Sequence, residues 1–138
     1  MGEKIAFGVT LRKKVLVVED EPVQIQILTS RLKASGFDVV VARDGVQSVS
    51  MARKENPDLV LLDIGLPGGD GYTVLHRLKS LGNSLMLPII AVSGRSAETD
   101  RAKMLAAGAD DYFQKPVQLD PLIARIRELL GEPAPTTS

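Results

Sequence analysis

The sequence DLVLLDIGLPGGDG, residues 58–71, joins an apolar run to an acidic residue and then to a glycine-rich loop. The run Leu59–Leu62 has the length and composition of a strand that is buried on both faces. Asp63 follows directly, and the proline and glycines behind it disfavour regular structure. The sequence therefore predicts a carboxylate at the end of a core strand, beside a loop.

Further apolar runs of strand length occur along the chain, and segments with helical spacing lie between them. The expected strands are residues 15–18, 39–41, 59–62, 89–92 and 111–114. The expected helices are residues 23–35, 45–55, 72–81, 98–107 and 119–130. Within the first helix, Ile27, Leu28 and Leu32 are expected to share the buried face, because residues three and four apart are neighbours on a helix.

This alternation of strands and helices predicts the fold class. Strands rich in valine, isoleucine and leucine that alternate with helices are typical of a parallel sheet covered on both faces. A closed barrel would need roughly eight such units in about 250 residues, which is more than this chain of 138 residues contains. We therefore expect an α/β fold with an open, doubly wound parallel sheet.

Composition limits the class of protein. A chain with 44% hydrophobic residues is long enough for one domain with a core, and its 17 basic and 17 acidic residues give no bulk argument for nucleic acid or an anionic membrane. The absence of cysteine excludes disulfides, thiolate metal sites and thiol nucleophiles. No apolar run approaches the roughly 20 residues of a membrane span, and the N-terminus lacks a signal-peptide core. These features predict a cytoplasmic domain that does not contact membranes.

Polar side chains follow four of the expected strands. They are Glu19 and Asp20, Asp63, Ser93, and Lys115. Ligands of open parallel sheets bind beyond the carboxyl ends of the strands, so these residues are candidates for one site. Each has an ordinary explanation when taken alone, namely a charge at a helix N-terminus, a turn or a solvated loop. Those explanations do not predict that all five meet at one edge.

The set is chemically coherent. Clustered carboxylates resist ionisation unless a cation is near, and oxygen ligands without histidine or cysteine favour a hard cation such as Mg²⁺ (or Mn²⁺). A carboxylate beside such an ion can attack phosphorus and form an acyl phosphate. A lysine and a hydroxyl would then stabilise the phosphoryl oxygens. We therefore predict that Asp63 is a nucleophile.

Four motifs occur along the chain in this order: VLVVEDEP, DLVLLDIGLPGGDG, IIAVSG and GADDYFQKPV. The order is typical of the receiver domains of two-component response regulators, and the sequence resembles that family over residues 14–130. The resemblance implies a flavodoxin-like (βα)5 fold with strand order 2-1-3-4-5. It implies a phosphorylation-dependent switch in which Asp63 accepts a phosphoryl group from a histidine kinase or a histidine phosphotransfer protein. Such a domain is no enzyme, apart from catalysing its own phosphorylation and dephosphorylation.

The resemblance also implies roles in metal binding. Glu19 and Asp20 match the acidic pair of the family, with Asp20 as the more direct ligand. Asp63 and the backbone carbonyl of Gly65 fall where the family supplies further ligands to Mg²⁺.

The resemblance likewise implies the switch residues. Lys115 matches the phosphate-pairing lysine, and its peptide bond to Pro116 is expected to be cis. Ser93 matches the switch hydroxyl and Tyr112 the switch aromatic, although Tyr112 also fits a core tyrosine whose hydroxyl reaches the surface. The small side chain of Gly94 is expected to leave the site open to phosphate, unless Gly94 is a plain turn residue. Phosphorylation is expected to change a face over residues 98–130 that binds a downstream protein or a second copy in a homodimer, without direct contact to nucleic acid.

The ends of the chain suggest its organisation. We expect an N-terminal extension at residues 1–13, the receiver domain at 14–130 and a flexible tail at 131–138. Both ends are too short to form a DNA-binding domain, which fits either a stand-alone receiver or one excised from a longer protein. Two other classes stay open. One is a receiver-like interaction module that does not use phosphorylation. The other is an aspartate-nucleophile phosphohydrolase, which is expected to carry a second acid where this chain has Gly65.

Overall fold

A five-stranded parallel sheet forms the centre of the molecule in the computed structural model, which describes residues 4–6, 9–65, 71–81, 87–94 and 97–132. The strands of this sheet are β3 (Lys14–Val18), β4 (Asp38–Ala42), β5 (Leu59–Asp63), β6 (Ile89–Ser93) and β7 (Asp111–Gln114). Their order across the sheet is β4-β3-β5-β6-β7. Counted along the chain, this is the order 2-1-3-4-5, so the predicted flavodoxin-like fold is confirmed.

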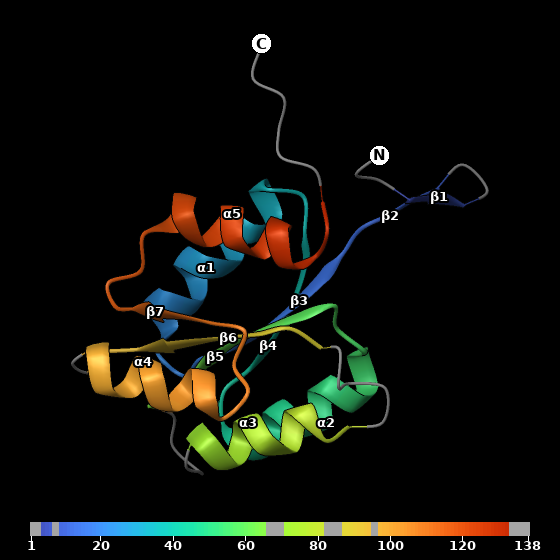
Figure 1. Cartoon of the computed structure of the whole chain (residues 1–138). Coiled ribbons are helices and arrows are strands. Elements are labelled where there is room, and N and C mark those ends of the chain that lie inside the picture. The colour runs from blue at the N-terminus through green and yellow to red at the C-terminus, as the bar shows by residue number, and fades with distance from the viewer. Residues whose placement is uncertain (1–3, 7–8, 66–70, 82–86, 95–96, 133–138) are drawn as a thin grey trace.

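Five helices cover the two faces of this sheet. They are α1 (Pro22–Ala34), α2 (Gly45–Glu55), α3 (Gly71–Lys79), α4 (Ala97–Ala106) and α5 (Leu119–Leu129). Helices α1 and α5 lie over one face, and α2, α3 and α4 lie over the other (Figure 1). The boundaries of these helices and of the five strands differ from the predicted ones by at most two residues.

The side chains of each central strand alternate between two cores. In β3, Val15 and Val17 pack with the helices α1 and α5, whereas Leu16 and Val18 pack with α2, α3 and α4. This alternation follows from the two-residue repeat of a strand, and it explains why β3 and β5 read as continuous apolar runs. The buried sheet therefore forms a rigid support for the residues that follow the strand ends.

Two features of the fold differ from the predictions or add to them. Ile27 is not buried, because its side chain is 43% exposed while Leu28 and Leu32 face the sheet. On a helix, Ile27 lies about 100° around the axis from Leu28, which turns it toward solvent.

The expected N-terminal extension contains an antiparallel pair of short strands, β1 (Lys4–Ala6) and β2 (Val9–Leu11), outside the main sheet.

Among the residues that the structure describes, no helix has the length and apolar character needed to cross a membrane. Residues 133–138 of the expected C-terminal tail lie outside the described part of the chain.

Candidate functional site

The candidate residues lie at the carboxyl edge of the sheet. The parallel register pairs Val18 with Leu62, so Glu19 and Asp20 leave β3 beside the end of β5, where Asp63 is the last residue. Ser93 is the last residue of β6 and lies opposite Gln114, which Lys115 follows. All of these side chains therefore come from adjacent strand ends, as the sequence predicted.

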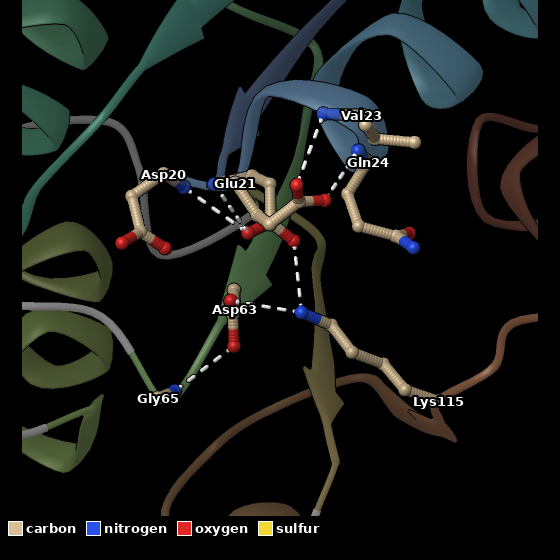
Figure 2. A network of polar contacts seen from close by, with 8 residues as sticks. Asp20, Glu21, Val23, Gln24, Asp63, Gly65 and Lys115 are labelled. Carbon is tan, nitrogen blue, oxygen red and sulfur yellow. Dashed lines mark hydrogen bonds and ion pairs between the residues drawn. The ribbon is translucent and has the colours of Figure 1, made fainter.

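Asp63 is held by contacts to both of its carboxylate oxygens. Its Oδ2 accepts a hydrogen bond of 3.0 Å from the Lys115 ammonium, and its Oδ1 accepts one of 2.9 Å from the backbone N–H of Gly65 (Figure 2). The side chain is largely buried, with 7% of the residue exposed. Asp63 is therefore a carboxylate held in place at the end of a core strand.

Glu19 is bound to the same lysine. Its Oε1 accepts a hydrogen bond of 2.9 Å from Lys115, and its Oε2 accepts hydrogen bonds from the backbone N–H groups of Asp20 and Glu21, both at 3.1 Å. Burial raises the pKa of the Glu19 carboxyl above its ordinary value, against the hydrogen bond from Lys115, and the nearby charge of Asp63 also raises it. Glu19 is thus a carboxylate whose charge needs a compensating cation.

Lys115 supplies only part of that compensation. Burial alone would lower the pKa of the Lys115 ammonium, but the hydrogen bonds to Glu19 and Asp63 outweigh burial and raise that pKa above its ordinary value. The lysine therefore stays protonated and carries one positive charge between two carboxylates. The peptide bond between Lys115 and Pro116 is cis, as predicted.

The acidic pair is not needed to cap the following helix. Glu21 is the N-cap of α1, and its carboxylate accepts hydrogen bonds from the N–H groups of Val23 at 3.2 Å and Gln24 at 2.8 Å (Figure 2). The sequence alone did not indicate this role, because glutamate is not among the preferred N-cap residues. The available signal was Pro22, which occupies the first helical position. The ordinary explanation of the Glu19–Asp20 pair as helix-terminal charge is therefore weakened.

The three carboxylates offer oxygen ligands at one point. One carboxylate oxygen from each of Glu19, Asp20 and Asp63 lies within 4.8 Å of the others. Three carboxylates near a single ammonium leave an excess of negative charge, and an oxygen-only donor set suits a hard divalent cation. Asp20 is exposed, which leaves room for the water ligands that Mg²⁺ retains. The residues present therefore fit the predicted metal. The predicted ligand role of the Gly65 carbonyl stays a prediction.

Ser93 and Gly94 differ in burial. Ser93 is 2% exposed at the end of β6, the strand next to Asp63. Gly94 is exposed, and a Cβ atom added there would meet nothing within 4 Å. The edge is therefore open beyond β6, which agrees with access for phosphate.

Tyr112 lies in the core beneath α4. The residue is 4% exposed and belongs to the same buried cluster as Ala91, Met104 and Ala109. Its hydroxyl is also buried and has no hydrogen-bond partner among the described residues. The expectation that a core tyrosine would place its hydroxyl at the surface is therefore wrong.

Gly71 is a further residue whose role is visible only in the structure. A Cβ atom at Gly71 would lie 2.7 Å from the Cβ of Ile64, which is closer than side chains tolerate. Glycine is therefore required where α3 begins against the segment that follows Asp63, and the tight contact fixes the start of this helix next to the candidate site.

The response regulator receiver domain family model matches residues 15–127. The chain belongs to this family. It is 38% identical over 123 residues to the probable transcriptional regulatory protein TcrX of Mycobacterium tuberculosis, covering 89% of this chain and 52% of that protein. The receiver domain thus spans about half the length of the curated relatives it matches.

Solved receiver structures have the same fold. A putative response regulator from Chloroflexus aurantiacus superimposes with a TM-score of 0.83 at 28% identity, covering 88% of this chain and 100% of that one. The receiver domain of sensor histidine kinase PA1611 from Pseudomonas aeruginosa gives a TM-score of 0.80 at 31% identity, with the same coverage of both chains. That structure contains a magnesium ion coordinated in its active site cleft.

Proposed function

We propose that this receiver domain is a signalling switch that accepts a phosphoryl group on Asp63. The observation that supports the assignment is the double contact of its carboxylate, with Lys115 at 3.0 Å and the Gly65 N–H at 2.9 Å, inside a cluster of further acidic groups. Family membership supports the phosphorylation-dependent switch, and the geometry supports Asp63 as the acceptor.

The proposed reaction uses the residues in distinct roles. A carboxylate oxygen of Asp63 attacks the phosphorus of a phosphohistidine, the P–N bond breaks, and its electron pair returns to the imidazole of the donor protein. Lys115 then hydrogen-bonds the transferred phosphoryl group through its ammonium, since that cation already lies against the acceptor oxygen. The donor is a histidine kinase or a histidine phosphotransfer protein.

We propose that Glu19, Asp20, Asp63 and the Gly65 carbonyl hold Mg²⁺, with Mn²⁺ as a substitute. When bound, the ion supplies positive charge that neutralises phosphoryl oxygens. The protein provides the oxygen ligands at one point and, through Lys115, a second positive charge on the same carboxylates. Asp20→Asn is expected to weaken Mg²⁺ binding more than Glu19→Gln, because Asp20 is exposed to the incoming ion whereas Glu19 is already bonded to Lys115.

The proposed output is a change in the face made by α4, β7 and α5. We expect Ser93 to move toward the phosphoryl group, because a dianion attracts its hydroxyl, and Tyr112 to rotate into the space that this movement vacates. Side chains already link the elements of this face. The Arg101 guanidinium donates to the carbonyl of Tyr112 at 3.3 Å, and that of Arg125 donates to Asp111 at 2.7 Å. The altered face binds a downstream protein or a second copy of the chain.

The alternatives have less support. A phosphohydrolase is expected to have a second acid at residue 65, where this chain has glycine. A module that does not use phosphorylation would not need the acidic cluster, the nucleophile and the lysine to be retained in contact with one another, as they are here.

Phosphorylation by a small acyl-phosphate donor with Mg²⁺, measured by intact-protein mass spectrometry, tests the assignment. Wild type is expected to gain a single phosphoryl group and Asp63→Asn none, because an amide cannot form the acyl phosphate. Asp38→Asn is the matched control, since Asp38 is exposed at the start of β4, at the opposite edge of the sheet. A phosphoryl adduct on Asp63→Asn at the wild-type rate would overturn the proposal.

A further inference from the structure

The surface between α2 and α3 is hollowed and basic. The two helices lie side by side on one face of the sheet (Figure 1). Two hollows between them, of about 480 and 450 Å³, share Val49, Arg53 and Arg77 in their walls. Val46 and Lys54 line the first hollow, and Leu81 lines the second. We call this surface the α2–α3 groove.

Among the described residues, the cations of the groove have no acidic partners. Within the described part of the chain, no carboxylate forms an ion pair with Arg53, Lys54 or Arg77, and no acidic residue lines either hollow. Two other cations near helix ends are paired, since Lys79 lies 2.8 Å from a carboxylate oxygen of Asp110 and Arg31 pairs with Asp120. In a chain with zero net charge, this is a local excess of positive charge.

The helix dipole explains part of this pattern but not all of it. Arg53 and Lys54 lie in the last turn of α2, and Arg77 lies in the last turn of α3, where basic residues are favourable. The dipole does not explain the apolar residues between the cations. Val46 is 67% exposed, although contact of an apolar side chain with water is unfavourable in free energy. Exposed apolar side chains beside cations are typical of a surface that binds a partner.

We infer that the α2–α3 groove binds an acidic peptide segment of a partner protein. Carboxylates of the segment would pair with Arg53 and Arg77, and an apolar side chain would cover Val46 and Val49. A nucleic acid would bind better to a longer row of cations and would leave the valines uncovered. A membrane surface would bind better to a convex apolar patch than to a groove. Charge and shape together therefore favour a peptide.

The groove is separate from the candidate phosphorylation site. Helices α2 and α3 run back from the carboxyl edge of the sheet, so Arg53 and Arg77 in their last turns lie toward the opposite edge. None of the residues that line the groove contributes to the acidic cluster. We therefore expect binding in the groove to be unchanged in Asp63→Asn, which separates this inference from the proposed function.

Fluorescence anisotropy with a short labelled peptide that carries several glutamates and one leucine tests the inference. Wild type is expected to bind this peptide at least about tenfold more tightly than the same peptide with glutamine for glutamate, and added salt should weaken binding. Arg53→Gln/Arg77→Gln is expected to lose roughly tenfold in affinity, because two charge-assisted contacts are removed. Lys33→Gln/Lys103→Gln, which removes the same charge from exposed positions on α1 and α4, should bind like wild type.

Competition and mapping complete the test. Val46→Ser should weaken peptide binding. NMR on wild type should show amide shifts caused by the peptide in α2 and α3. The mapping on wild type tests the inference even if the double variant does not fold. The inference is overturned if the glutamine peptide binds equally well or if the shifts lie elsewhere. It is also overturned if a single-stranded oligonucleotide or phosphatidylserine vesicles bind the groove more tightly than the acidic peptide.

Discussion

Lys115 and Tyr112 belong to the same short segment of chain, yet their polar atoms lie in opposite situations. The Lys115 ammonium follows β7 and contacts the carboxylates of Glu19 and Asp63 at 2.9 and 3.0 Å. The Tyr112 hydroxyl, within β7, is buried and has no hydrogen-bond partner among the described residues. The charged site is therefore stabilised in its present arrangement, whereas Tyr112 would become more stable after any rotation that gave its hydroxyl a hydrogen-bond partner. In the proposed switch, Lys115 is therefore the residue held in place and Tyr112 the residue that favours movement.

The largest expected effect comes from breaking the charged site. Lys115→Met leaves the buried carboxylates of Glu19 and Asp63 without a cation, so the metal-free protein is expected to lose about 2 kcal/mol of unfolding free energy at neutral pH. Mg²⁺ should restore part of this loss, because it supplies the missing positive charge. Urea denaturation with and without Mg²⁺ measures both effects.

Lys79→Met is the matched control for this prediction. Lys79 pairs with Asp110, whose side chain is 34% exposed, so the loss should be smaller and independent of Mg²⁺. Equal losses that Mg²⁺ does not change in either variant would contradict the difference between the two pairs.

The buried hydroxyl of Tyr112 gives a smaller effect of opposite sign. Tyr112→Phe removes a polar atom that has no partner, so the unphosphorylated protein is expected to become more stable by about 1 kcal/mol. Tyr72, the other tyrosine, makes an interaction in the structure, and Tyr72→Phe is not expected to raise stability. Urea denaturation of the two variants tests this. A loss of stability in Tyr112→Phe would mean that the hydroxyl is satisfied.

The smallest expected effect is the pH dependence of metal binding. Burial raises the pKa of Glu19 above its ordinary value of 4.5. At pH values between 4.5 and the raised pKa, the metal-free native state therefore holds a proton that the unfolded chain has already released. Metal-free stability therefore falls as pH rises through this window, and Mg²⁺ must displace the proton below the folded pKa. The stabilisation by Mg²⁺ should be larger near pH 8 than near pH 5, as thermal melts can measure. Equal stabilisation at both values would contradict the raised pKa.

Sequence patterns predicted the features that depend on order along the chain. Parallel strands place the residues after each strand at one edge, so the meeting of Glu19, Asp63 and Lys115 followed from the fold class. The two strands β1 and β2 escaped prediction because each has only three residues. Short runs of this kind carry no reliable periodicity.

Features that depend on packing between distant elements were not predictable. The burial of the Tyr112 hydroxyl depends on how the core beneath α4 closes around it, and the exposure of Ile27 depends on the rotation of α1 against the sheet. The need for glycine at residue 71 arises from its contact with Ile64, which a one-dimensional pattern does not reveal. The residues of the site could therefore be predicted from the sequence. The contrast between the paired Lys115 ammonium and the unpaired Tyr112 hydroxyl is known only from the described structure.

Chemical trapping of the phosphorylated residue tests the central claim most directly. Borohydride reduces an acyl phosphate to an alcohol, so the phosphorylated protein, reduced and digested, reveals the acceptor as homoserine by peptide mass spectrometry. The account predicts homoserine at residue 63 in the peptide that contains the end of β5, and none in Asp63→Asn. Homoserine at residue 20, or trapping that is unchanged in Asp63→Asn, would contradict the assignment of Asp63 as the phosphoacceptor.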